Sequence, residues 1–176
     1  SRRFCLPRRF RRACGEPQSL IEALIMQASG IGELSAFAGT SFSKLLTPEA
    51  ASQFSLSSMG AIGTLRTLTA AHTLGVVPCH VSQIGPMIEQ GIIGCDVAFV
   101  QVSPADENGE HSFGLIADYV QSAVKKARVV IAEVNDQVPY THGERLPASR
   151  IDCAVQVSRM PVEVAAARIG ETDEAI

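Results

Sequence analysis

Short apolar runs alternate along the chain with segments in which apolar residues recur at helical spacing. The short runs, which lie over 34–39, 53–57, 74–79, 95–103, 128–134 and 151–157, predict strands. Helical spacing predicts helices over 17–29, 63–72, 82–90 and 115–127. Strands that alternate with helices predict an α/β fold, with one open, mostly parallel sheet and helices on both of its faces.

The positive charge is concentrated at the start of the chain. Six of the 15 Lys and Arg residues lie within residues 1–12, so from Ala13 onward nine basic residues stand against 18 acidic ones. A body this acidic repels a nucleic-acid backbone, so we expect no nucleic-acid partner. No run reaches the roughly 18 apolar residues of a membrane span, so we expect no membrane partner either.

The five cysteines are odd in number, widely separated and without a CxxC pair. This spacing argues against a disulfide framework and a zinc knuckle and favours the reducing cytoplasm. Residues 1–12 form an Arg-rich segment that we expect to be disordered or non-native. A mitochondrial transit segment stays open as an alternative, because no acidic residue precedes Glu16.

Several well-known site motifs fail at identifiable positions. The stretch 39–43 has Ser43 where a serine-hydrolase elbow needs Gly, and the stretch 104–115 has Pro104 and Leu115 at two ligand positions of a calcium loop. The histidines share no metalloprotease spacing, and Gly60 with Gly63 falls short of a dinucleotide or phosphate loop. We therefore expect no metal site and no resident cofactor.

The loop sequences that do carry a pattern are collinear over nearly the whole chain. They are ACGEPQSLIEAL (13–24), FAGTSFS (37–43), GAIGTLR (60–66), VVPCHVSQI (76–84), DVAFVQVSPADENGEHSFG (96–114) and AEVNDQVPYTHGE (132–144). Taken together they resemble the N-terminal domain of the acetyl-CoA hydrolase/transferase family, which includes 4-hydroxybutyrate and succinyl-CoA:acetate CoA-transferases. The family enters its CGEP motif through an apolar strand, whereas this chain has CLPRRFRR there, which puts the first strand in doubt.

The resemblance implies a CoA-transferase fold of two α/β halves, of which this chain is the first. It implies acyl-CoA and a small carboxylate of the acetate, succinate, butyrate or 4-hydroxybutyrate class as substrates. The nucleophilic glutamate, which forms a glutamyl-CoA intermediate, would lie beyond Ile176, so no residue here is catalytic. We expect residues 13–158 to be the domain and 159–176 a linker toward an absent C-terminal half, with a homo-oligomer when complete.

In an open α/β sheet, ligands bind beyond the carboxyl ends of the strands. The loops there supply hydroxyls, backbone N–H groups and polar side chains that suit a carboxylate and a thioester. The candidates for substrate binding are Gly39, Thr40, Ser41, Gly60, Gly63, His80, Ser82, Ser103, Pro104, Asn108, Gly109, Glu133 and Asn135. Turn geometry or structural hydrogen bonding is the competing interpretation for these positions, and for Glu133 we favour it.

Two other functions stay open. The first is a truncated, non-catalytic α/β domain that binds a partner half through an exposed apolar face. The second is a small-ligand protein of the sugar-phosphate isomerase type, because related α/β architectures serve many functions.

Overall fold

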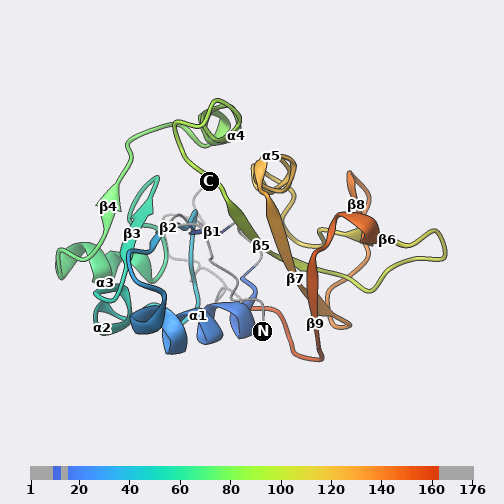
Figure 1. Cartoon of the computed structure of the whole chain (residues 1–176), viewed down its shortest axis with the longest axis horizontal. Coiled ribbons are helices and arrows are strands. Elements are labelled where there is room, and N and C mark those ends of the chain that lie inside the picture. The colour runs from blue at the N-terminus through green and yellow to red at the C-terminus, as the bar shows by residue number, and fades with distance from the viewer. Residues whose placement is uncertain (1–9, 13–15, 163–176) are drawn as a thin grey trace, which may run out of the picture.

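The strand predicted over 95–103 lies inside a fully parallel sheet. The computed structural model describes residues 10–12 and 16–162, whose arrangement is shown in Figure 1. This sheet has the order β1-β5-β7-β9. Its strands are β1 (Phe10–Arg12), β5 (Val97–Val102), β7 (Val129–Asn135) and β9 (Cys153–Val157). Every residue of β5 is buried, as expected for a parallel strand covered on both faces.

A second parallel sheet continues the layer beyond β1. It contains β2 (Ser35–Phe37), β3 (Ser55–Ser58) and β4 (Gly75–Val76), in that order. Because β1 contacts β2, the strands run in the order β4-β3-β2-β1-β5-β7-β9. All six predicted strands are confirmed as parallel strands. Among residues 10–12 and 16–162, no hydrogen-bonded ladder joins β1 to β2, so the expected layer consists of two parallel sheets that lie side by side.

Helices cover both faces of this layer, as predicted. They are α1 (Gln18–Ile31), α2 (Pro48–Ala51), α3 (Leu65–Ala70), α4 (Val81–Glu89) and α5 (Val120–Lys126). Figure 1 shows α4 and α5 on one side of the strands and α1 on the other. Alternate residues of β5 serve the two cores: Ala98 and Val100 pack with α4 and α5, whereas Val97 and Phe99 pack with α1 and α3. None of the helices in the described ranges is long and apolar enough to cross a membrane.

Four local features differ from the sequence-based expectations, and the first is the short helix α2, which apolar spacing did not predict. The helix predicted over 115–127 begins only at Val120, whose N–H donates to Asp118 Oδ1 at 3.2 Å, and such local bonds compete with an earlier helical start. An unpredicted antiparallel ribbon pairs β6 (Glu110–Ser112) with β8 (Arg145–Pro147). Residues 10–12 form β1 rather than part of a disordered segment, and residues 1–9 lie outside the described ranges.

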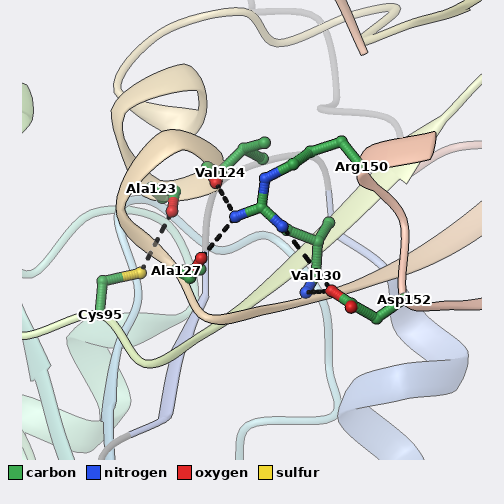
Figure 2. Close-up of polar contacts among 7 residues, drawn as sticks. All are labelled: Cys95, Ala123, Val124, Ala127, Val130, Arg150 and Asp152. Carbon is green, nitrogen blue, oxygen red and sulfur yellow. Dashed lines mark hydrogen bonds and ion pairs between the residues drawn. The ribbon is translucent and has the colours of Figure 1, made fainter. Parts of the chain in front are cut away.

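The short 3-10 helix η1 (Ala148–Arg150) ties the ribbon to the end of α5. Figure 2 shows Arg150 Nη2 donating to Val124 O at 2.7 Å and also to Ala127 O. Asp152 pairs with Arg150 at 3.7 Å and accepts from Val130 N at 2.8 Å. A cation at the carboxyl end of a helix satisfies carbonyls that have no partner within the helix. Arg150 therefore joins α5 to the start of β7 and β9.

Candidate functional site

A cavity opens at the carboxyl ends of the strands, where the strand order reverses around β1. Its volume is about 150 Å³. Open α/β sheets bind ligands at this kind of reversal point. The residues that line it come from the loops after β1, β2, β6 and β9 and from β5 itself: Glu16, Thr40, Phe42, Gln101, Phe113, Leu115, Ile116, Pro161 and Val162. The wall is mostly apolar, and Glu16, Thr40 and Gln101 supply its polar side chains.

Glu16 and Gln101 form the polar part of the wall. The N–H of Phe42 donates to Glu16 Oε1. Gln101 Nε2 donates to Glu16 O at 3.3 Å and to Glu133 Oε1 at 2.8 Å. These two acceptors determine the orientation of the amide, because only its nitrogen can donate to them. Gln101 Oε1 is consequently left as a hydrogen-bond acceptor.

Glu133 lies behind this wall and joins β7 to the start of α1. Its side chain has no exposed surface, and Oε2 accepts from Ser19 N at 2.6 Å. A carboxyl group at a helix N-terminus satisfies a backbone donor that has no partner within the helix. The structural role that we favoured for Glu133 agrees with this geometry, and Glu133 reaches the cavity only through Gln101.

Asn135 holds the segment that follows β9. Its side chain, also without exposed surface, donates from Nδ2 to Arg159 O at 2.8 Å and accepts at Oδ1 from Arg159 N at 3.2 Å. Arg159 Nη2 then donates to Ser19 Oγ at 2.8 Å. Pro161 and Val162, two residues of the cavity wall, follow after Met160. Asn135 thus positions the wall without lining the cavity.

The loops after β2 and β3 meet behind Thr40. Ser41 forms an isolated bridge with Gly63, and Ser41 O accepts from Thr64 N at 2.7 Å. Ser41 is fully buried and does not line the cavity; its Oγ has no hydrogen-bond partner among the described residues. Gly39 O accepts from Ser58 Oγ at 2.7 Å, and Gly60 O from Ser58 Oγ at 3.0 Å. Of this group, only Thr40 lines the cavity.

His80 and Ser82 lie at the start of α4, away from the cavity. His80 is the N-cap: Ser82 N donates to its Nδ1 at 3.4 Å, and His80 N donates to Gln83 Oε1 at 2.8 Å. Both His80 and Ser82 are exposed. Structural hydrogen bonding was the competing interpretation for His80 and Ser82, and their bonds at the start of α4 are of this kind.

The loop that contains Ser103, Pro104, Asn108 and Gly109 closes on itself. Ser103 is buried and accepts at Oγ from Ser112 N at 3.0 Å, whereas Pro104 and Asn108 are exposed. Gly109 takes a positive φ of 76°. None of the four lines the cavity.

Asp106 organises that loop. Hydrogen bonds from Glu110 N and then from the Tyr140 hydroxyl lower the pKa of Asp106, and the same bond, at 2.7 Å, raises the pKa of Tyr140. Asp106 also accepts from Asn108 N at 2.9 Å. The Asp106 carboxylate therefore holds the loop over 103–110 together and joins it to Tyr140.

The structure brings together few of the residues named from the sequence. Thr40 lines the cavity, and Glu133 and Asn135 support its wall from behind. Sequence analysis missed Glu16, Phe42 and Gln101. A signal existed for two of them: Gln101 is the only polar residue of β5, and Glu16 stands in the CGEP stretch. Within the described residues no group of three His, Cys, Asp or Glu side chains is placed to hold a metal ion.

The parallel layer, with helices on both faces and a cavity at the strand reversal, defines an open α/β domain. The chain belongs to the acetyl-CoA hydrolase/transferase N-terminal domain family, whose sequence model matches residues 9–166. This finding confirms the resemblance, and the fold agrees with the expectation of a mostly parallel α/β domain.

Two curated relatives are CoA-transferases. The 4-hydroxybutyrate coenzyme A transferase of Clostridium kluyveri is 29% identical over 170 residues, which are 95% of this chain and 40% of the relative. The butyryl-CoA:acetate CoA-transferase of Anaerostipes caccae is 34% identical over 82 residues, or 45% of this chain and 18% of the relative. The chain thus spans at most about two fifths of the length of these relatives.

Solved structures give the same fold. The 4-hydroxybutyrate CoA-transferase of Porphyromonas gingivalis matches with a TM-score of 0.66 and 27% identity, over 89% of this chain and 36% of that one. RipA from Yersinia pestis matches with a TM-score of 0.85 and 24% identity, over 93% of this chain and 42% of that one. The likeness to RipA, at this identity, concerns the fold alone.

Proposed function

We propose that this chain forms the acyl-binding half of a CoA-transferase or acyl-CoA hydrolase that acts on small carboxylic acids. The substrates would be acyl-CoA and a free acid of the acetate, succinate, butyrate or 4-hydroxybutyrate class. Coenzyme A would enter as a substrate and not as a resident cofactor. A second half, reached through residues 159–176, would carry the nucleophilic glutamate, and the complete enzyme would be a cytoplasmic homo-oligomer.

The observation that carries this proposal is the cavity at the strand reversal. A dry cavity of about 150 Å³ lined by Leu, Ile and Phe holds a ring of six carbons in another protein. The cavity described here has the same volume and a wall built from Phe42, Phe113, Leu115 and Ile116. Butyrate, with about six non-hydrogen atoms, is therefore of suitable size. Whole CoA is far too large, so only the acyl end would enter.

The proposed chemistry divides the work between the two halves. The second-half glutamate adds to the thioester carbonyl, the C–S bond breaks, and CoA leaves as a thiolate from an acyl-glutamyl anhydride. The thiolate then attacks the glutamyl carbonyl, which releases the first acid as a carboxylate and leaves a glutamyl-CoA thioester. The same two steps then occur in reverse with the acceptor acid. Its carboxylate attacks the glutamyl-CoA thioester and releases the CoA thiolate, which attacks the acceptor's acyl carbonyl to form the new acyl-CoA and free the glutamate. Exclusion of water by the second half would favour transfer to the acid over hydrolysis.

Thr40 is the polar residue that we assign to the substrate carboxylate. It follows β2 and lines the cavity, whereas its neighbour Ser41 is turned into the protein. A hydrogen bond from a hydroxyl to a carboxylate is charge-assisted and stronger than a neutral one. Gly39, Gly60 and Gly63 would support Thr40 through the loop contacts behind it.

The test is a CoA-transfer assay with acetyl-CoA and acetate, succinate or butyrate as acceptor. The chain is assayed alone and mixed with a second-half polypeptide that contains the family glutamate. Activity only in the mixture supports the proposal. Activity of the chain alone would place a nucleophile within these 176 residues and overturn the assignment of roles. Thioester loss without any acid acceptor would identify a hydrolase.

Thr40→Val tests the assigned residue in the active mixture, with Thr69→Val on the exposed side of α3 as control. Loss of one hydrogen bond to a charged group should lower kcat/KM about tenfold for Thr40→Val. The control should retain the original rate. Equal rates for the two variants would remove Thr40 from the site.

A further inference from the structure

Phe113 lines two separate hollows of the domain. The first is the cavity at the strand reversal, with a volume of about 150 Å³, and the second has a volume of about 160 Å³. Among the residues that the structure describes, Phe113 is the only one that the two walls share. Its side chain is buried and belongs to the core below α4 and α5. Phe113 therefore stands between the two hollows.

The second hollow has an apolar floor and a charged rim. Val124 of α5, which Figure 2 shows, and Leu146 of β8 belong to its wall and are buried. Lys125 and Glu144, which pair at 3.7 Å, also belong to the wall, and more than half of each side chain is exposed. The floor suits an alkyl chain, and the rim stays in contact with water. An acyl chain in the first cavity could extend to this floor only past Phe113.

The backbone on both sides of Phe113 is held in place. Ser112 Oγ accepts from Thr141 N and from Gly114 N, each at 3.1 Å, and Thr141 Oγ1 donates to Gly114 O at 2.8 Å. Gly114 has a φ of 66°, and an added Cβ would lie 2.2 Å from Val138 Cγ1. Side chains in a close-packed core have little room to move when their backbone is fixed. The ring of Phe113 is therefore a rigid wall.

We propose that Phe113 determines the length of the acyl chain that the protein accepts. Its ring ends the cavity beyond a chain of about the size of butyrate and excludes hexanoate and longer acids, because an overfilled pocket forces side chains out of their packed positions. This inference rests on the proposed CoA-transfer function and narrows its substrate class to short-chain acids.

The first experiment compares substrates without altering the protein. In the active mixture, kcat/KM is measured with acetate as acceptor and butyryl-CoA, hexanoyl-CoA or octanoyl-CoA as donor. Hexanoyl-CoA should be at least about tenfold poorer than butyryl-CoA, because even a single methylene changes kcat/KM by about tenfold or more in an apolar pocket. Equal values for these donors would mean that no wall ends the cavity and would overturn the proposal.

The second experiment removes the wall with Phe113→Ala. The two hollows have similar volumes, so joining them would give about twice the space. The readout is the ratio of kcat/KM for hexanoyl-CoA to that for butyryl-CoA, which should rise at least about tenfold. Phe54→Ala is the matched control, because Phe54 is buried in the other core and lines neither hollow. It removes the same atoms and should leave the ratio unchanged.

The outcomes separate this inference from the proposed function. Absence of transfer from every donor in the unaltered mixture would contradict the CoA-transfer function itself. Transfer with an unchanged ratio in Phe113→Ala, or an equal rise in Phe54→Ala, would overturn only the role of Phe113.

A milder pair of variants covers a failure of Phe113→Ala to fold, which circular dichroism would reveal. Phe113→Leu leaves a smaller cavity in the core than Phe113→Ala does. The ratio for Phe113→Leu should rise by less than for Phe113→Ala, and that for Phe54→Leu should not change. An unchanged ratio in folded Phe113→Leu would overturn the proposal.

Discussion

Gly63→Ala should destabilise the chain far more than an ordinary glycine substitution. Gly63 has a φ of 66°, and an added Cβ would lie 2.1 Å from Ser41 O and 3.1 Å from Phe42 Cδ1. The close atom is a backbone carbonyl oxygen, so it cannot rotate away as a side chain would. The substitution therefore forces the loops after β2 and β3 apart.

The size of the effect follows from two contributions. The left-handed conformation costs a residue with a side chain about 1 to 2 kcal/mol. Separating the loops also breaks the bonds that Ser41 O accepts from Thr64 N at 2.7 Å and from Thr64 Oγ1 at 2.9 Å. Each such bond contributes about 1 kcal/mol. We therefore expect a loss of about 3 to 4 kcal/mol for Gly63→Ala.

Gly109→Ala is the matched control, because Gly109 has a similar φ of 76° but no atom within 4 Å of an added Cβ. It should cost only the conformational part, about 1 to 2 kcal/mol. Urea unfolding followed by circular dichroism measures both variants against the unaltered chain. If Gly63→Ala and Gly109→Ala lost the same stability, the close approach of the two loops behind Thr40 would be refuted.

Three further predictions concern the supports of the site and of the fold. Glu133→Ala leaves Ser19 N and Gln101 Nε2 without their acceptor in a buried place and should lower the unfolding free energy by about 2 to 4 kcal/mol; an unchanged urea midpoint would contradict this role. Arg150→Met removes the cation from the end of α5 and should cost about 1 to 2 kcal/mol, whereas Lys44→Met at an exposed position should cost little; equal losses would refute the cap. Because hydrogen bonds lower the pKa of Asp106 below its ordinary 3.8, its contribution to stability is present above pH 3.8 and is lost as the pH falls through the lowered value. Asp106→Asn should remove that acid sensitivity and bring the pKa of Tyr140 back toward 10.0, which NMR titration of the ring measures; a Tyr140 pKa that stays raised would refute the bond.

The local pattern of apolar and polar residues predicted most of the secondary structure. Runs such as 95–103 and 128–134 are apolar over the length of a strand, and helical spacing in 17–29 places its apolar residues on one side. These periodicities express which face is buried, so they predicted β5, β7 and α1 from the sequence alone. The collinear loop sequences, taken together, indicated the family, and the match over residues 9–166 confirmed it.

The start of a helix and the pairing of distant strands were not predictable in this way. Helix α5 begins at Val120, whose N–H donates to Asp118 Oδ1, and the spacing of apolar residues carries no information about such a bond. The β6 and β8 segments pair across more than 30 residues of chain. Each is only three residues long, too short to show a period of its own.

The cavity itself was decided by tertiary structure. Glu16 and Gln101 are 85 positions apart in sequence and meet because β1 and β5 pair side by side. Thr40 lines the cavity and Ser41 does not, because the bridge between Ser41 and Gly63 turns Ser41 into the protein. The sequence by itself predicted that the loop after β2 lies at the carboxyl ends of the strands, but it did not predict that segments after β1, β6 and β9 complete the cavity wall. Which side chains of those loops face the ligand depended on strand order and on hydrogen bonds between distant segments, and these exist only once the chain is folded.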